Sequence, residues 1–128
     1  MYEINTWGDS MKHIHVVDDE EATRRSLRLM LKRHGYSVSV STDGKEALDF
    51  IAQGTGSVDL LITDINMPKL NGLDLLRELD RKAIRLPFLV MSGGTDDRQR
   101  LGSGLEVLSK PLVETNVLDG IQKAFASQ

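Results

Sequence analysis

The sequence predicts an α/β fold, a doubly wound parallel sheet of five strands covered by helices on both faces. Short apolar or β-branched runs alternate with segments of helical periodicity five times along the 128 residues. This alternation is typical of parallel strands joined by right-handed helical crossovers. The run Leu60–Ile62 is continuously apolar, as expected for a strand covered on both faces. It leads to Asp64, and polar residues follow three other strands, which indicates a shared site beyond one edge of the sheet.

Composition and charge are those of a single soluble domain. Hydrophobic residues make up 40% of the chain and charged residues 27%, and the formal net charge is −3. Without a long basic run, this balance argues against nucleic-acid binding. The absence of cysteine excludes disulfides, zinc–thiolate sites and thiol catalysis. No apolar stretch approaches membrane-spanning length, so we expect a cytoplasmic protein without membrane contact.

The first ten residues differ in character from the rest of the chain. Residues 1–10 are polar and mixed, and Trp7 is their only large anchor. We interpret them as an N-terminal tail, with the folded domain over residues 11–128. Trp7 is a candidate contact for a partner, although a loosely ordered terminus is the simpler interpretation.

The first strand is predicted over His13–Val17, where a short β-branched run meets three acidic residues, Asp18, Asp19 and Glu20. His13 and His15 lie two residues apart and therefore on one face of this strand. A metal pair is conceivable, but no third ligand lies nearby. We interpret both as partly packed histidines.

The first helix is predicted over Glu20–His34. Its core-compatible positions recur with helical spacing at Thr23, Leu27, Met30, Leu31 and His34. Acidic residues begin it and basic residues end it, as the helix dipole favours. Its exposed side is basic, and two interpretations stay open: a solvated face, or a docking surface for an acidic partner, formed by Arg24, Arg25 and Arg28.

The middle of the chain supplies the second and third strands. Tyr36–Thr42 alternates strictly and is predicted to be an edge strand. The helix Lys45–Gln53 comes next, with Ala47, Leu48 and Ile51 on its buried side, and a glycine-containing loop leads to the central strand. After Pro68 a helix is expected over Leu70–Lys82, with three leucines inside, Leu73, Leu76 and Leu79.

The last third contains a weaker helix signal. Leu86–Met91 is predicted as the fourth strand and Leu105–Leu108 as the fifth. Between them, Thr95–Leu101 allows only about two turns of helix before glycines interrupt it. The final helix is predicted from an apolar stripe formed by Val113, Val117, Leu118, Ile121 and Phe125.

Polar groups at four strand ends point to one chemistry. Three carboxylates held close together repel one another unless a cation lies between them. A ligand set made of oxygen atoms, with no cysteine sulfur, is the kind that Mg²⁺ prefers. Lys110 adds a fixed positive charge, Ser92 a hydroxyl donor, and Gly93 leaves a backbone amide open to an anion. These are the parts needed for phosphoryl transfer onto a carboxylate. We expect Asp64 to be the acceptor, with the adjacent pair Asp18 and Asp19 holding the metal.

At these residues the chain resembles the receiver domain of two-component response regulators. The resemblance runs from about Lys12 to Phe125 and rests on five motifs: Val16-Val-Asp-Asp-Glu20, Leu61-Ile-Thr-Asp-Ile-Asn-Met-Pro68, Asn71-Gly72, Ser92-Gly93 and Lys110-Pro111. It implies a flavodoxin-like fold with strand order 2-1-3-4-5. It also implies a cis peptide between Lys110 and Pro111, which aims the lysine into the site.

The resemblance also implies roles for the site residues. Asp64 accepts a phosphoryl group from a histidine kinase or a histidine phosphotransfer protein. Asp18, Asp19, Asp64 and the backbone carbonyl of Asn66 hold Mg²⁺. Ser92 binds a phosphoryl oxygen and swings inward on phosphorylation, with the Gly93 backbone beside it, and Lys110 pairs with the acyl phosphate.

Two departures from the family pattern concern the switch face rather than the phosphorylation site. Val107 stands where the family usually has an aromatic residue, three positions before the lysine. The interval between Ser92 and Lys110 is also shorter than usual by about one helical turn. We therefore expect standard chemistry at Asp64, a short or frayed fourth helix, and an atypical switch face.

The favoured hypothesis is a stand-alone receiver that acts through a downstream protein target or relays its phosphoryl group, with a phosphorylation-linked homodimer left open. Such a domain is a signalling switch rather than a classical enzyme. One alternative is a Mg²⁺-dependent phosphatase with an aspartate nucleophile, but such enzymes often need an acid where this chain has Asn66. Another is a pseudo-receiver, a non-phosphorylated interaction module, which would require a missing site residue.

Overall fold

The computed structural model describes residues 12–54, 57–94 and 105–127. Within them the chain forms a five-stranded parallel sheet in the order β2-β1-β3-β4-β5, which confirms the predicted fold and strand order. The strands are β1 (His13–Val17), β2 (Ser37–Ser41), β3 (Leu60–Asp64), β4 (Phe88–Ser92) and β5 (Val107–Ser109).

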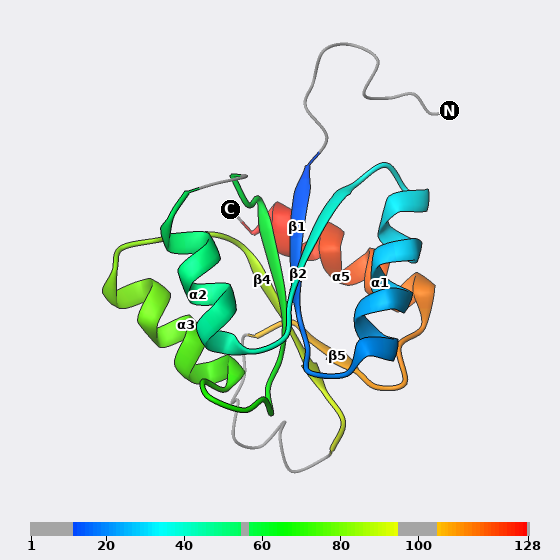
Figure 1. The fold of residues 1–128 in the computed structure, drawn as a ribbon. Helices are drawn as coiled ribbons and strands as arrows, with labels where there is room; N and C mark the ends of the chain where they lie inside the picture. The colour runs from blue at the N-terminus through cyan, green and yellow to red at the C-terminus, as the bar shows by residue number, and fades with distance from the viewer. Residues whose placement is uncertain (1–11, 55–56, 95–104, 128) are drawn as a thin grey trace.

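Helices cover both faces of this sheet (Figure 1). Two of them, α1 and α5, lie on one side, and α2 and α3 lie on the other. Their bounds are α1 (Glu21–Arg33), α2 (Gly44–Ala52), α3 (Gly72–Arg81) and α5 (Glu114–Ala126).

The sheet therefore separates two apolar cores. The larger core packs α1 and α5 against alternate residues of the strands, among them Ile14, Ile62 and Leu89. The smaller core packs α2 and α3 against the opposite side chains, such as Val17 and Leu61. Because β3 is central, all five of its residues are buried, as its continuous apolar run predicted.

Short-range signals set the ends of the helices. Asp43 caps α2 by accepting a hydrogen bond from the backbone N–H of Glu46 at 2.8 Å. Asn71 caps α3 in the same way through the N–H of Asp74 at 2.9 Å. After α1, Gly35 adopts a left-handed conformation with φ of 88°, which glycine tolerates without steric cost.

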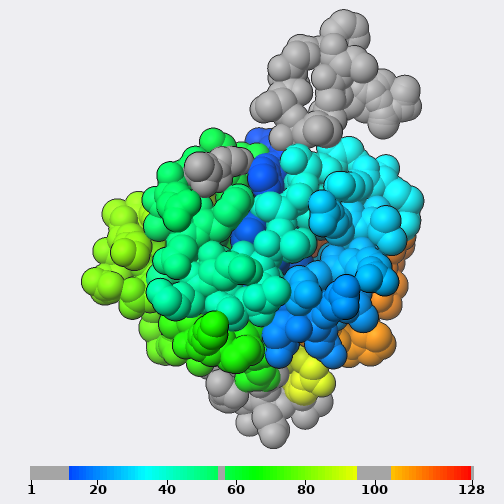
Figure 2. Space-filling view, in the orientation of Figure 1, coloured from blue at the N-terminus to red at the C-terminus, as the bar shows by residue number. Residues whose placement is uncertain are grey.

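Strand β2 lies at the edge of the sheet, as its alternating sequence predicted. Its first four residues are only half-buried, because one side of the strand has no neighbouring strand. Figure 2 shows side chains of α1 and α2 packed around this edge.

Three predictions about burial need correction. In α3, Leu75 and Leu79 are the buried leucines, while Leu73 and Leu76 are half-buried, because the helix turns its Leu75 side toward the sheet. Val113 is not part of the stripe of α5: it precedes the helix as its N-cap and is 51% exposed. His15 is fully buried rather than partly packed, since its ring stacks on Phe50 with centroids 4.6 Å apart.

Some predictions concern residues outside the described ranges. The proposed tail over residues 1–10, with Trp7, and the proposed fourth helix over 95–101 both lie there. The fifth strand was predicted over Leu105–Leu108 but runs from Val107 to Ser109 and is shorter. In the described part of the chain, no helix is both long and apolar enough to cross a lipid bilayer.

Candidate functional site

The candidate site lies beyond the carboxyl ends of the strands, where β1 and β3 run side by side. Asp64 is the last residue of β3, and Asp18 comes directly after the last residue of β1. The register pairs Val17 with Thr63, so parallel pairing alone brings the two carboxylates to the same edge.

Three carboxylates gather there. One ligand oxygen from each of Asp18, Asp19 and Asp64 lies within 4.8 Å of the others. Asp18 is fully buried and Asp64 is 7% exposed, whereas Asp19 faces solvent. Burial of two like charges at this distance is unfavourable without a cation.

Lys110 supplies part of that positive charge. Its Nζ lies 2.8 Å from Oδ2 of Asp18 and 3.4 Å from Oδ2 of Asp64. A third contact joins it to Oε1 of Glu20 at 3.4 Å. The Lys110–Pro111 peptide is cis, as the resemblance implied.

Burial and these contacts shift the pKa values of Asp64 and Lys110. Burial raises the pKa of Asp64 to about 6, and the charge of Asp18 acts in the same direction, while Lys110 and the N–H of Ile65 oppose the rise. Burial acts to lower the pKa of Lys110, but the hydrogen bond and charge of Asp18, with those of Asp64, outweigh it and raise the pKa. Near neutral pH, Asp64 is therefore mainly ionised and Lys110 is protonated.

The backbone holds the two buried carboxylates in place. The N–H of Glu20 donates to Oδ1 of Asp18 at 2.9 Å, and the N–H of Ile65 donates to Oδ1 of Asp64 at 2.9 Å. In both residues the other oxygen, Oδ2, contacts Lys110. Each carboxylate thus has one oxygen fixed by the backbone and one facing the centre of the site.

Two supporting residues were not recognised as such from the sequence. Arg24, expected to be part of an exposed basic face, donates from Nη1 to the backbone carbonyl of Asp18 at 2.8 Å. Gly72 packs so closely that a Cβ there would lie 2.2 Å from the carbonyl oxygen of Asp64. The only sequence signals were the position of Arg24 in the first turns of α1 and the Asn71-Gly72 dipeptide.

Ser92 is the last residue of the neighbouring strand β4, and Gly93 follows it. Asp64 pairs with Met91 in the sheet register, so Ser92 lies one residue beyond that pairing on β4. Its hydroxyl donates to the carbonyl of Gly94 at 2.9 Å, and its own carbonyl accepts from the N–H of Lys110 at 2.8 Å. Gly93 is exposed, and a Cβ built on it has no neighbour within 4 Å.

Asn66 and Val107 lie at the margins of the site. Asn66 is exposed in the turn after Asp64. Val107 is half-buried at the start of β5, where it pairs with Val90.

The predicted site residues thus fall into two groups. Lys110 contacts Asp18 and Asp64 directly, and a ligand oxygen of Asp19 lies within 4.8 Å of theirs. Strand register and chain connection place Ser92, Gly93 and Asn66 beside this cluster.

The donor set suits a hard divalent cation. Carboxylate oxygens are the ligands that Mg²⁺ prefers, and Mg²⁺ keeps several waters, as an exposed ligand such as Asp19 allows. The like charges of Asp18 and Asp64 also need more positive charge than one lysine provides. The acidic cluster of Asp18, Asp19 and Asp64 therefore fits Mg²⁺.

A flavodoxin-like domain with an acidic pocket and a lysine at the carboxyl edge of its sheet has the architecture of a receiver-type signalling domain. The chain belongs to the response regulator receiver domain family, whose model matches residues 14–122.

Relatives and solved structures agree with this membership. The chain is 32% identical over 116 residues to the transcriptional regulatory protein FixJ of Rhizobium meliloti, covering 87% of this chain and 55% of the relative. It is 42% identical over 93 residues to the response regulator MprA of Mycolicibacterium vanbaalenii, covering 73% and 39%. The chain therefore spans about half the length, or less, of these two relatives.

Two solved structures extend the similarity to three dimensions. A response regulator receiver domain protein from Clostridium thermocellum superposes with a TM-score of 0.80 at 27% identity, covering 91% of this chain and 96% of the other. The structure titled FixJ-N superposes with a TM-score of 0.76 at 29% identity, covering 91% and 95%.

Proposed function

We propose that this receiver domain accepts a phosphoryl group on Asp64 from a histidine kinase or a histidine phosphotransfer protein in a Mg²⁺-dependent reaction. The observation that carries the proposal is the position of Lys110, whose Nζ contacts Oδ2 of both Asp18 and Asp64 beside a third carboxylate. A buried carboxylate with an adjacent cation and metal ligands is suited to form an acyl phosphate.

Asp64 is the nucleophile in this proposal. Its pKa of about 6 leaves it mainly ionised near neutral pH, and the N–H of Ile65 fixes Oδ1. Oδ2 attacks phosphorus, the new O–P bond forms as the P–N bond to the donor imidazole breaks, and the imidazole nitrogen keeps the electron pair. The products are a mixed anhydride on Asp64 and an imidazole free of phosphate.

The remaining residues stabilise the transferred group. Lys110 places its positive charge beside the acyl phosphate. The Ser92 hydroxyl and the N–H of Gly93 donate to phosphoryl oxygens. Asp18, Asp19, Asp64 and the Asn66 carbonyl hold Mg²⁺, which when bound neutralises charge on the carboxylates and the phosphoryl oxygens.

A cavity of about 540 Å³ beside Lys110 leaves room for a donor. It lies between the start of α1 and the segment after β5, and small α1 side chains, Ala22 and Ser26, line it together with Pro111 and Leu112. Lys110 and Glu20 line it on the side of the acidic site and contact each other at 3.4 Å. We propose that a protein donor docks over this surface.

Output is proposed to occur through protein contacts, either with a downstream target or by relay of the phosphoryl group. A stand-alone protein, the division at residues 10 and 11, a cytoplasmic location and a phosphorylation-linked homodimer all stay predictions. The match covers 55% of FixJ and 39% of MprA, so their full activities are not transferred to this chain.

The test compares Asp64→Asn with the wild type. Both are incubated with a small phosphodonor and Mg²⁺ and resolved on a phosphate-sensitive gel, with intact mass as a second readout. Asp49→Asn is the matched control, because Asp49 is an exposed α2 aspartate paired with Lys45. We expect label on the wild type and the control and none on Asp64→Asn. Label on all three, or on none, rejects Asp64 as the acceptor.

A further inference from the structure

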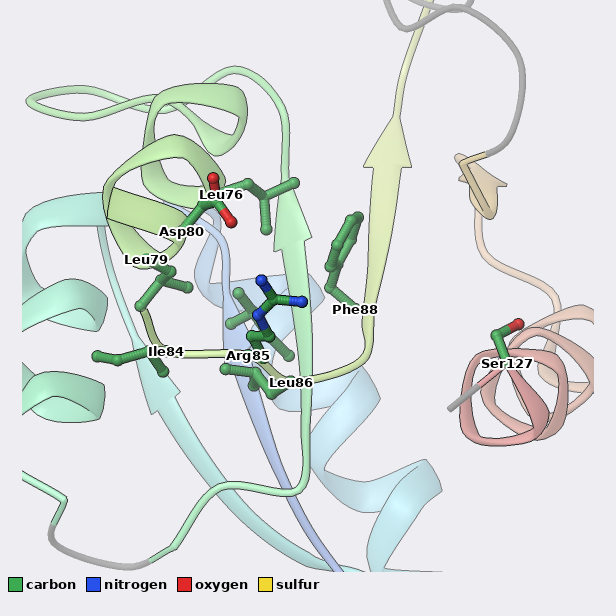
Figure 3. Close-up of a pocket in the computed structure, with 9 residues that line it drawn as sticks. Leu76, Leu79, Asp80, Ile84, Arg85, Leu86, Phe88 and Ser127 are labelled. Atoms are coloured by element: carbon green, nitrogen blue, oxygen red, sulfur yellow. The ribbon is translucent and has the colours of Figure 1, made fainter. Parts of the chain in front are cut away.

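A cavity of about 400 Å³ lies at the opposite end of the sheet from the acidic site (Figure 3). Leu61, near the start of β3, and Phe88, the first residue of β4, place it at the amino ends of the strands. Its volume is within the range of about 300–1,000 Å³ that small-molecule sites occupy. Its apolar lining comes from Leu61, Leu76, Leu79, Ile84, Leu86 and Phe88.

The end of α3 shapes one wall of this cavity. The N–H of Ile84 donates to the carbonyl of Leu79 at 2.9 Å, and the N–H of Ala83 donates to that of Asp80 at 2.9 Å. This is a Schellman ending, which brings Ile84 against Leu79. Its left-handed residue is Ala83, with φ of 60°, where glycine is usual. The chain thus keeps a strained conformation at the residue that precedes two lining positions.

Two charged side chains stand at the cavity. Figure 3 shows the guanidinium of Arg85 in the space between α3 and Phe88, with the carboxylate of Asp80 above it on α3. Two nearby α3 arginines are paired, Arg77 with Asp74 at 2.9 Å and Arg81 with Glu78 at 2.6 Å. Among the described residues, no ion pair within 4 Å involves Arg85.

We propose that this cavity binds a small apolar monocarboxylate. The carboxylate pairs with the Arg85 guanidinium, whose planar fork matches carboxylate geometry. The aliphatic or aromatic body of the ligand packs against Leu76, Ile84 and Phe88. Asp80 disfavours a second carboxylate on the same ligand, so monocarboxylates bind more tightly than dicarboxylates of equal size. This site is independent of the phosphoryl chemistry proposed at Asp64.

The test uses 3-phenylpropionate as the probe and follows leucine and isoleucine methyl signals of the full chain by NMR. We expect saturable shifts at Leu76, Leu79 and Ile84. The neutral 3-phenylpropanamide should bind about ten-fold more weakly, because it lacks the charge-assisted pair. The dicarboxylate phenylsuccinate should also bind more weakly than 3-phenylpropionate. The Asp80→Asn variant should reduce the difference in affinity between these two ligands.

Two variants test the role of the cation. Arg85→Gln should weaken binding of 3-phenylpropionate about ten-fold and leave binding of the amide unchanged. Arg81→Gln is the matched control, because Arg81 is paired with Glu78 and does not line the cavity. Absence of saturable shifts with 3-phenylpropionate, equal affinity for acid and amide, or equal effects of the two variants overturns the proposal.

Discussion

Nζ of Lys110 lies 2.8 Å from Oδ2 of Asp18, an ion pair between residues 92 positions apart. The Asp18 side chain is fully buried and the lysine side chain is 19% exposed. The pair therefore links the segment after β1 to the segment after β5 across the acidic site, and it compensates a carboxylate that has no access to water.

Replacing Lys110 with alanine should leave Asp18 buried without its cation. We expect the free energy of unfolding in metal-free buffer to fall by about 3 kcal/mol, because breaking a buried pair from one side costs about 3–5 kcal/mol. Urea denaturation measures the loss. Lys123→Ala, which removes an exposed pair with Asp119, is the control and should change stability little. Equal losses in the two variants would contradict the role of the pair.

Magnesium should stabilise the folded domain. At a Mg²⁺ concentration of 100 times the dissociation constant, the free energy of unfolding should rise by about 2.7 kcal/mol. Asp18→Asn should lose most of this gain, and Asp49→Asn should keep it, because Asp49 lies on α2 outside the acidic cluster. The measurement is thermal unfolding with and without Mg²⁺. A gain that survives in Asp18→Asn would place the metal elsewhere.

The stability of the domain should depend on pH through His15. Burial, with the charge of His13, lowers the pKa of His15 from 6.5 to about 4. Between these values the unfolded chain holds a proton that the folded chain lacks. His15 therefore makes the free energy of unfolding rise with pH in this window, by about 1.4 kcal/mol per pH unit. Its contribution is complete above pH 6.5 and is lost as the pH falls toward 4.

Asp64 should act in the opposite sense in metal-free buffer. Its pKa is raised from 3.8 to about 6, so in this window the folded state holds the extra proton and stability falls as pH rises. In the wild type, the opposite effects of His15 and Asp64 on the pH dependence of the free energy of unfolding should nearly cancel between about pH 4 and 6. Urea denaturation across this window should give a rising curve for Asp64→Asn and a falling curve for His15→Phe. Parallel curves for all three proteins would disprove both assignments.

A pair of glycines tests the packing beneath Asp64. Gly72→Ala forces a Cβ to within 2.2 Å of the Asp64 carbonyl, whereas a Cβ at Gly93 meets nothing within 4 Å. We expect Gly72→Ala to cost about 1–3 kcal/mol of stability and to slow phosphorylation, because Asp64 must shift. Gly93→Ala should change stability little. Unfolding curves and phosphodonor labelling measure both effects, and indistinguishable variants would argue against the close approach.

Ser92 tests the conformational response. Ser92→Ala should still be phosphorylated at Asp64, because the carboxylate and Lys110 are intact, but the amide shifts caused by phosphorylation should be smaller. Ser92→Thr keeps the hydroxyl and should keep the response. An unchanged pattern of amide shifts in Ser92→Ala would remove the hydroxyl from the switch.

The sequence pattern predicted a parallel sheet, the edge position of β2 and the grouping of Asp18, Asp64 and Lys110, while the strand order was implied by the resemblance to receiver domains. The grouping was predictable because parallel strands joined by helical crossovers carry their carboxyl ends to one edge. Periodicity also predicted Leu73, Leu76 and Leu79 as inside residues of α3, where the structure buries Leu79 together with Leu75. A leucine-rich helix can be rotated about its axis in several ways that all place leucines inside. Only packing against the sheet decides which of these orientations the helix adopts.

Local pattern and chain connectivity thus determined which residues form strands and helices and which polar groups share the site. Tertiary structure alone decided how those groups are held: the contact of Arg24 with the Asp18 carbonyl, the approach of Gly72 to Asp64 and the stacking of His15 on Phe50. These contacts depend on where separate elements meet. Hydrophobic periodicity records which face of an element is buried, but not which atom of a distant element lies against it.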